Sequence, residues 1–520
     1  MRFAIPAAIA LMFCATLAAA DLDLWQLALK NRSVHRFSTL FTAQDVRGRL
    51  STDAGIDQAI DWCRKTGVTK VYVESFRGED APEGPLVRAR DRFRAAGLEV
   101  SGCVTTVNVG KPSTGWKDTI SCYTDRATQD HLQAIFERAA SFSDEVMIDD
   151  FWFTDCACPE CEAARRAKTV RVGDVVTAAP GDTWEDYRCE LMTRLSRERV
   201  IGPAKRVNPK VKLIVKFPQW YDRFHERGYE VARESADFDR TWVGTETRDY
   251  GDRQWGGTPQ YEGFFIMRWL GGIGGAKCGG GWFDPYGTTE ATYIEQARQT
   301  ILGGARESLL FCYGSLQEGT GPRNIAALRR NIPELLAVAA EVRKRTIAGV
   351  AAYKPPNSHP DTESRVFDFV GMMGIPLAPC HAFPTRAPAA FFSLHALKDP
   401  KLAERLTTFI HSGRPTLITD GLAGRLKGKA PLDAANVTIL RVAGEPKNLL
   451  TISEGELDGL RAPLLKVIGA SMTGPNRVGF YPFTDGSWVA ENFNDTAVSV
   501  EVNGRRIDLG ARGWICSWAN

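Results

Sequence analysis

Short apolar runs alternate with longer amphipathic stretches from about residue 35 to residue 345, and this alternation constrains the fold more than any other feature. The runs predicted to be strands are residues 35–42, 70–76, 98–105, 145–153, 212–217, 240–246, 280–284 and 308–313. The stretches predicted to be helices are residues 53–66, 85–96, 125–140, 184–200, 229–236 and 289–302. Strands that alternate with helices form parallel sheets. Eight such units fit a (β/α)8 barrel, which usually takes about 250 residues.

The seventh predicted strand is the weakest, because Gly279, Gly280 and Gly281 disfavour a strand by propensity. An open, doubly wound sheet is the alternative arrangement of the same units. That arrangement usually carries a glycine-rich phosphate loop after its first strand, and the sequence has none there. We therefore predict a barrel over residues 21–347.

The remainder of the chain is predicted to form two smaller domains, which makes the overall class α/β. A proline-rich segment, residues 354–360, follows the barrel region. Residues 348–428 are predicted to be a small α/β domain of flavodoxin-like type. Residues 429–520 are predicted to be a C-terminal β domain, since Asp485-Gly486 and Asn503-Gly504 are typical hairpin turns.

The first 20 residues have the pattern of a secretory signal peptide. Arg2 is followed by an apolar run and then by the small residues Ala18, Ala19 and Ala20. We therefore expect export to the periplasm or the extracellular space. No later segment has about 18 consecutive apolar residues, so no membrane span is predicted. The 65 Lys and Arg residues nearly balance 62 Asp and Glu residues, which gives no reason to expect a nucleic-acid or membrane partner.

Acidic side chains recur at the C-terminal ends of the predicted strands, where a barrel builds its active site. Asp149 and Asp150 end the fourth strand, Glu246 the sixth and Asp284 the seventh. Paired carboxylates catalyse glycoside hydrolysis, and adjacent carboxylates help to keep one of them protonated. We predict that these four residues are catalytic, with Asp150 ahead of Asp149. Metal binding by the aspartate pair and a surface ion pair at Glu246 are the competing interpretations.

Aromatic and charged side chains near the same strand ends are predicted to bind a carbohydrate, since aromatic faces stack on sugar rings. The predicted substrate-binding set is Glu74, Trp152, Lys216, Trp220, Tyr221, Arg248 and Trp282. Arg248 is expected to orient Glu246 and to favour its use as a nucleophile or base. The competing interpretation is that the aromatic residues belong to the core and the acids pair with nearby arginines.

Three cysteines follow the fourth predicted strand in a Cys-x-Cys-x-x-Cys pattern, Cys156, Cys158 and Cys161. This spacing is typical of half of a tetrahedral zinc site. Cys122, after the third strand, is the nearest candidate for a fourth ligand. Four cysteines leave no open coordination position, so a bound Zn²⁺ would be structural. A disulfide between two of them is the alternative in an exported protein.

These features together resemble family 42 glycoside hydrolases, in domain order over nearly the whole mature chain and in specific motifs over about residues 120–165. The resemblance implies a β-galactosidase-like barrel, an amidotransferase-like middle domain, a small β domain and zinc bound by Cys122, Cys156, Cys158 and Cys161. That family has Asn-Glu at the end of strand four, whereas this chain has Asp150-Phe151. The family's strand-seven nucleophile is a Glu, and this chain offers Asp284. We therefore expect a distant relative with a different substrate.

A strand-four aspartate together with a strand-six carboxylate also resembles α-galactosidase-type barrels, in which the aspartate is the nucleophile. Family 42 uses its strand-four Glu as the acid/base, so the two resemblances imply opposite roles for Asp150, and both remain open at this point. The predicted function is an exported glycoside hydrolase that acts on an oligo- or polysaccharide. The alternative is a glycan-binding protein without a working acid pair. The middle domain lacks a Gly-x-Cys-x-Gly pattern around Cys380 and is predicted to be structural, with a homo-oligomer contact as its candidate role.

Overall fold

The computed structural model of the chain describes residues 23–248 and 257–519. The predicted signal peptide, residues 1–20, lies outside the described residues. Within those residues, no helix is both long enough and apolar enough to span a membrane.

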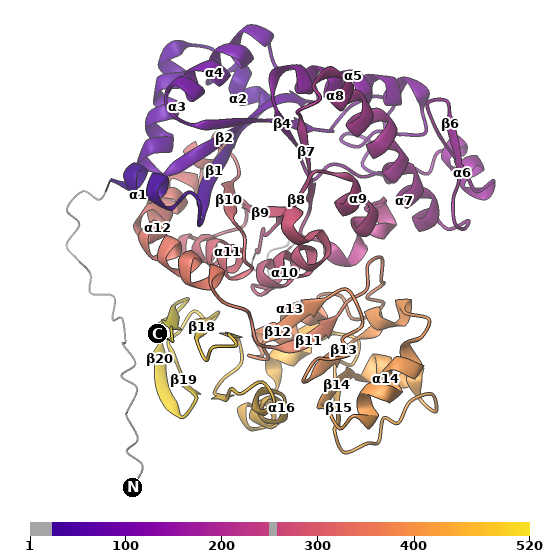
Figure 1. Cartoon of the computed structure of the whole chain (residues 1–520), viewed down its shortest axis with the longest axis vertical. Coiled ribbons are helices and arrows are strands. Elements are labelled where there is room, and N and C mark those ends of the chain that lie inside the picture. The colour runs from indigo at the N-terminus through magenta and orange to yellow at the C-terminus, as the bar shows by residue number, and fades with distance from the viewer. Residues whose placement is uncertain (1–22, 249–256, 520) are drawn as a thin grey trace.

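Among the described residues, eight parallel strands close into a barrel, which confirms the predicted fold class (Figure 1). In chain order the barrel strands are β1 (Arg36–Phe41), β2 (Val68–Arg77), β3 (Glu99–Thr105), β4 (Glu145–Ile148), β7 (Lys212–Phe217), β8 (Arg240–Gly244), β9 (Cys278–Phe283) and β10 (Glu307–Leu310). The barrel closes where β1 pairs in parallel with β10. An antiparallel hairpin, β5 (Thr169–Val172) and β6 (Val175–Ala178), lies outside the barrel.

Helices surround the barrel, and those predicted from the sequence are all present. The helices of this region are α1 (Leu24–Asn31), α2 (Ala43–Arg47), α3 (Asp53–Lys65), α4 (Glu83–Ala95), α5 (Arg126–Phe142), α6 (Pro159–Arg166), α7 (Trp184–Leu195), α8 (Gly202–Val207), α9 (Val231–Asp237), α10 (Glu262–Gly274), α11 (Glu290–Leu302) and α12 (Gly321–Arg343). Side chains cap several of them: Thr52, Asp125 and Thr183 accept backbone N–H groups at the starts of α3, α5 and α7.

One apolar side chain from each barrel strand enters a layer that fills the barrel interior. These residues are Leu40, Tyr72, Cys103, Met147, Ile214, Trp242, Trp282 and Leu309. The rings of Tyr72 and Trp242 meet edge to face at 5.8 Å. The opening seen between the ribbons in Figure 1 is therefore packed with side chains rather than hollow.

The glycines of β9 are a consequence of this packing. A Cβ atom on Gly280 would lie 2.7 Å from the Trp242 ring and 2.6 Å from the backbone oxygen of Glu307. A Cβ atom on Gly281 would lie 2.5 Å from the Thr300 side chain. The segment is a strand despite its low propensity, because only glycine leaves room for the indole.

The middle part of the described chain contains a parallel five-stranded sheet in the order β12-β11-β13-β14-β15. Its strands are β11 (Val350–Tyr353), β12 (Leu377–Cys380), β13 (Ala390–Phe392), β14 (Thr416–Thr419) and β15 (Val437–Leu440), with helices α13 (Val366–Met372), α14 (Leu402–His411) and α15 (Asp420–Leu426). β15 pairs in parallel with β14. Residues 437–440 therefore belong to this sheet rather than to the C-terminal β region in which the sequence prediction placed them.

The C-terminal part of the chain, after helix α16 (Glu454–Lys466), is antiparallel β structure. Its strands are β16 (Met472–Thr473), β17 (Val478–Pro482), β18 (Trp488–Asn492), β19 (Val498–Val502), β20 (Arg505–Leu509) and β21 (Trp514–Ser517). Both predicted hairpins are present, β17–β18 around Asp485-Gly486 and β19–β20 around Asn503-Gly504.

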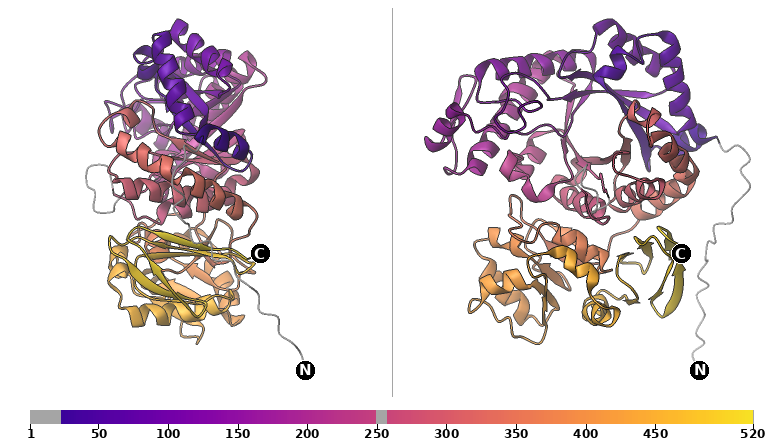
Figure 2. Two further views of the ribbon diagram at one scale, coloured as in Figure 1. Left: turned by 90° about the vertical axis from the view of Figure 1, so that its left-hand side faces the viewer. Right: turned by 180° about the vertical axis from the view of Figure 1, so that it is seen from behind.

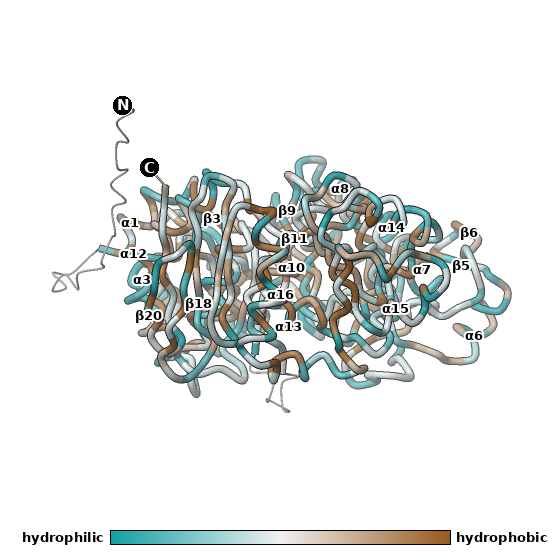
Figure 3. The backbone as a smooth tube through the Cα atoms, turned by 90° about the horizontal axis from the view of Figure 1, so that it is seen from below, coloured by the Kyte–Doolittle hydropathy of each residue, from teal (hydrophilic) through white to brown (hydrophobic). Residues whose placement is uncertain are grey.

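The two smaller parts lie side by side along one flank of the barrel (Figures 1 and 2). Hydrophobic segments run through the body of the molecule, and hydrophilic segments dominate much of its periphery (Figure 3). Buried hydrogen bonds join the barrel to both parts. Tyr221 donates to Asp368 at 2.9 Å in the middle part, and Gln299 donates to Glu491 at 2.6 Å in the C-terminal part.

Candidate active site

A cluster of charged and polar side chains lies at the C-terminal ends of the barrel strands. Strand periodicity explains how they gather, because residues two apart on a strand face the same side. Each rim residue follows an interior residue by two positions in the pairs Tyr72/Glu74, Cys103/Thr105, Met147/Asp149, Ile214/Lys216 and Trp282/Asp284. Along each of these strands, the first of the two inward-facing residues is apolar and the second is polar.

Lys216, at the centre of the cluster, contacts two carboxyl groups. Its Nζ lies 2.8 Å from Asp150 Oδ2 and 2.7 Å from Glu246 Oε1. Because both distances share one nitrogen, the two oxygens lie no more than 5.5 Å apart. Lys216 is fully buried and its ammonium lies 4.3 Å from the centre of the Trp282 ring, so it is a fixed charge beneath the two acids.

Asp149 lies in a second group with Glu74, Arg77 and Thr105. Arg77 donates to Asp149 at 2.8 Å and to Glu74 at 2.9 Å. The Thr105 hydroxyl contacts both carboxyl groups, although it has one hydrogen to donate. Burial raises the pKa of Glu74.

Asp284 and Arg248 form a third group, which Gln219 connects to Glu246. Arg248 makes an ion pair with Asp284, not with Glu246 as the sequence predicted. The Gln219 side-chain amide donates to Glu246 Oε2 at 2.8 Å and accepts from Arg248 Nη1 at 3.0 Å. Arg248 is therefore connected to Glu246 by hydrogen bonds through the Gln219 amide.

The electrostatics of the cluster separate its aspartates. Burial raises the pKa of Asp150 well above its ordinary value; Lys216 opposes this rise, while Asp149 and Glu246 add to it. Burial also acts on Asp149, but the charges of Arg77 and Lys216 outweigh it and lower its pKa. The pKa values of these two adjacent aspartates are therefore shifted in opposite directions, upward for Asp150 and downward for Asp149.

Asp284 differs from both. Burial raises the pKa of Asp284 to about 6, against the lowering effect of Arg248. Its side chain is 6% exposed, whereas the side chain of Asp150 is 22% exposed. Of the four predicted catalytic acids, Asp150 is the one most open to solvent, since Asp149 and Glu246 are 2% and 4% exposed.

The aromatic residues predicted to bind substrate divide into two groups. Trp282 lies at the floor of the cluster, stacked on Phe311 with ring centres 4.9 Å apart. Trp220 is half-buried beside Phe153, their ring centres 5.6 Å apart. Both positions are compatible with the prediction.

Trp152 and Tyr221 are core residues, which corrects the prediction for both. Trp152 is fully buried, and its Nε1 donates to Ser196 and Glu234 on the helical side of the barrel wall. Tyr221 is buried where the barrel meets the middle part of the chain, and its hydroxyl bonds Asp368. Their aromatic character suits packing, and a sequence pattern does not distinguish a ring that faces the mouth from one that faces a helix.

Sequence reasoning missed Arg77 and Gln219. Arg77 is the last residue of β2, one position beyond the predicted end of that strand, and Gln219 follows the end of β7 by two residues. Both would have been found by extending the search for polar side chains two residues past each predicted strand.

The four cysteines Cys122, Cys156, Cys158 and Cys161 come together as predicted. Their sulfur atoms all lie within 4.8 Å of one another, and the three resolved contacts among Cys122, Cys158 and Cys161 measure 3.6–3.8 Å. These separations are far longer than a disulfide of about 2.05 Å, and the cysteines of the described residues are free thiols. Bonds of about 2.3 Å to one ion place sulfurs at such separations. The buried cluster could hold a structural metal ion such as zinc.

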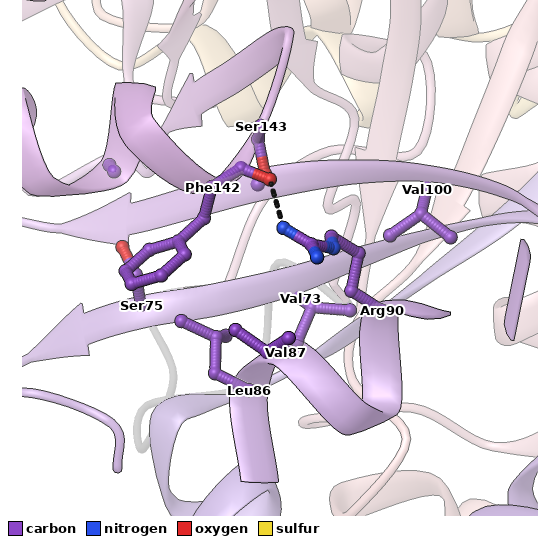
Figure 4. A pocket seen from close by; sticks show the side chains of 10 residues that line it. Val73, Ser75, Leu86, Val87, Arg90, Val100, Phe142 and Ser143 are labelled. Carbon is purple, nitrogen blue, oxygen red and sulfur yellow. Dashed lines mark hydrogen bonds between the residues drawn. The ribbon is translucent and has the colours of Figure 1, made fainter. Parts of the chain in front are cut away.

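A small cavity elsewhere in the barrel wall is not part of this site (Figure 4). It lies between β2, β3 and helices α4 and α5, and about 10 Å³ is available inside it, close to the space of one water molecule. Apolar side chains such as Val73, Leu86 and Val100 line it, and Arg90 beside it donates to the Phe142 carbonyl at 3.2 Å. It is a gap in helix–sheet packing.

Comparison with known proteins agrees with this arrangement. Residues 23–330 match the family described as "Probable glycosyl hydrolase, catalytic domain". The chain belongs to this family. The match covers the whole barrel, so the glycosyl hydrolase catalytic domain and the cluster of acids coincide.

Individual relatives of this chain are distant. An uncharacterised protein of Saccharolobus solfataricus is 25% identical over 367 residues, which are 66% of this chain and 59% of that protein. The chain thus spans less than two thirds of that relative's length. A GH5_18 enzyme of Bifidobacterium longum subsp. longum is 10% identical with a TM-score of 0.44, over 72% of this chain and 96% of that one. The GH36 α-galactosidase AgaB of Geobacillus stearothermophilus is 9% identical with a TM-score of 0.34, over 61% and 43%. No residue role is transferred from these two structures.

Proposed function

We propose that the protein is an exported glycoside hydrolase that cleaves an oligo- or polysaccharide with retention of anomeric configuration, using Asp150 and Glu246. The observation that carries the proposal is the contact of both acids with Lys216, which limits their nearest oxygens to a separation of 5.5 Å. Retaining enzymes place their carboxyl groups about 5–5.5 Å apart, and inverting enzymes about 6.5–9.5 Å.

Asp150 is proposed as the acid/base. It is the most exposed of the four acids, and burial holds its pKa well above the ordinary value, so it can bring a proton to the leaving group. Glu246 is proposed as the nucleophile. Lys216 and Gln219 donate to its two oxygens, an environment that suits a carboxylate. The proposed role of Asp150 is that of the strand-four glutamate of family 42, whereas the nucleophile of that family lies on strand seven and Glu246 follows the sixth barrel strand, β8.

The reaction then follows in two balanced steps. Glu246 attacks the anomeric carbon and forms a glycosyl ester while the bond to the leaving oxygen breaks and Asp150 transfers its proton to that oxygen. Asp150, now a carboxylate, takes a proton from water as the water oxygen attacks the anomeric carbon. The ester bond breaks, and Glu246 returns to its carboxylate form with Asp150 protonated again. Lys216 stays charged beneath both acids and offsets the negative charge that moves between them.

A covalent trap tests this function directly. 2-Deoxy-2-fluoro glycosyl fluorides with α- and β-galactosyl, β-glucosyl and β-mannosyl configurations are each incubated with the protein. We expect one of them to leave a fluoroglycosyl mass on the peptide that contains Glu246. A label on Asp150 would reverse the roles, and an inverted product anomer seen by NMR would exclude the retaining mechanism. Glycan binding with no hydrolysis of natural or aryl glycosides would instead favour the non-catalytic alternative.

We also propose that the four-cysteine cluster binds zinc and fixes the loop after β4, which carries Asp149 and Asp150. Cys158→Ser should lower zinc affinity more than 100-fold. Loss of a residue that only hydrogen-bonds to a metal ligand already costs about 10–100-fold in affinity. The thermal midpoint should fall with the zinc content. Cys380→Ser, in the middle part of the chain, is the matched control and should retain zinc. Equal zinc content of both variants, measured by mass spectrometry of the metal, would contradict the proposal.

A further inference from the structure

We infer that Glu185, His225 and His359 form a second metal-binding site, separate from the cysteine cluster and from the candidate active site. Glu185 lies on α7, His225 begins the short 3-10 turn His225–Arg227, and His359 lies in the segment between β11 and α13. One ligand atom from each residue falls within 4.8 Å of the other two. Two imidazoles and a carboxylate from three separate segments, one of them more than 130 positions from the other two, thus lie close together.

The contacts around His359 show how close the group is to a coordination sphere. His359 Nε2 lies 2.9 Å from Glu185 Oε1. The rings of His225 and His359 meet edge to face with centres 4.2 Å apart. Metal bonds of about 2.0–2.2 Å place ligand atoms roughly 3.3–4.4 Å apart.

The environment of His225 indicates a metal-binding site rather than a surface ion pair. It is 3% exposed, and its Nε2 has no hydrogen-bond partner among the described residues. Its imidazole therefore holds an unused lone pair or N–H inside the protein.

The donor set indicates the kind of ion. Two imidazoles and one carboxylate suit zinc and neighbouring first-row divalent ions, and three protein ligands leave one position for water. The side chains of Glu185 and His359 are 36% and 51% exposed, which gives that water access. Glu226 lies 3.8 Å from His359 Nδ1 and is placed to orient the ring from its other side.

Such an ion would join the barrel to the middle part of the chain. His359 belongs to the segment that follows β11, whereas His225 belongs to the loop between β7 and α9. The same loop carries Gln219 and Trp220 at the rim of the candidate active site. Binding of the ion should therefore restrict this loop and hold the two parts of the chain together.

Cobalt titration of the metal-free full chain distinguishes this site from the cysteine cluster. Co²⁺ bound by thiolates gives intense sulfur-to-metal charge-transfer bands, whereas Co²⁺ bound by imidazole and carboxylate gives only weak ligand-field bands. We expect His359→Ala to bind one Co²⁺ fewer than the wild-type chain, or to bind it at least ~10-fold more weakly, with the charge-transfer bands unchanged. His225→Ala should behave in the same way, and His411→Ala, at an exposed position on α14, should match the wild type.

The His359 variant keeps the proposal testable if the buried His225 variant does not fold, because His359 is half-exposed and its loss leaves no cavity. The inference would be overturned if His359→Ala and the wild type bound the same number of Co²⁺ ions with the same affinity and spectrum. It would also be overturned if the bands lost in His359→Ala were the thiolate bands.

Discussion

Glu246→Gln should reduce turnover by at least ~10⁴-fold on every substrate, whatever its leaving group, because the amide does not form the glycosyl ester. The geometry supports so large an effect. Both oxygens of Glu246 are fixed by donors from Lys216 and Gln219, so no neighbouring carboxyl group takes its place without a rearrangement of the cluster. The measurement is kcat on aryl glycosides of the sugar that the protein hydrolyses.

Asp150→Asn provides the contrast within the same experiment. Loss of a general acid costs about 10²–10⁴-fold when the leaving oxygen needs a proton. With a strongly acidic phenol as leaving group, the first step should proceed at nearly the normal rate and the ester intermediate should accumulate. Glu79→Gln, an exposed acid that pairs with Arg47, is the control and should retain full activity. If Glu246→Gln instead showed the dependence on leaving group, Asp150 would be the nucleophile, as in α-galactosidase-type barrels.

Lys216→Met should lower the free energy of unfolding by about 3–5 kcal/mol at pH 7, because it leaves two carboxyl groups at the rim without their shared cation. The loss should be smaller at pH 5. Carboxyl groups whose pKa is raised in the folded state, as that of Asp150 is, favour folding at low pH and oppose it as the pH rises through that pKa. Urea denaturation at the two pH values measures both effects.

Lys70→Met is the matched control for this variant. Lys70 is equally buried and pairs with Glu145 at 2.6 Å, but it lies at the opposite end of the barrel from the candidate active site. Both variants should be destabilised. Only Lys216→Met should also have a lower kcat when the rate is divided by the amount of folded protein. Unchanged stability of Lys216→Met at pH 7 would mean that the two acids share a proton rather than a cation.

The barrel and the position of its acids could be predicted because they depend on local patterns. Period-two alternation placed Asp149, Lys216 and Asp284 at strand ends, and the Cys-x-Cys-x-x-Cys spacing identified three of the four clustered cysteines. The direction of side chains in loops was not accessible in this way. Trp152 and Tyr221 are residue types that can stack on sugar rings, but here Trp152 packs against helices and Tyr221 packs against the middle part of the chain.

Interactions between distant segments account for the other differences. Arg248 pairs with Asp284, because strand β9, which precedes Asp284, lies next to strand β8, which precedes Arg248. His359 contacts Glu185 where the middle part of the chain packs on the barrel, and this contact joins residues 174 positions apart. Residues 437–440 belong to a parallel sheet whose first strand along the chain, β11, begins nearly 90 residues earlier.

The layer of Tyr72, Trp242 and Trp282 fills the barrel interior beneath the acids and closes it on the N-terminal side of the strands. Under the proposed mechanism, everything that reaches the acids enters by one opening and departs by it. The released alcohol must therefore clear the mouth before water approaches the ester from the same side. Release of the leaving group would therefore precede the attack of water, and a bulky leaving group would slow the second step as well as the first.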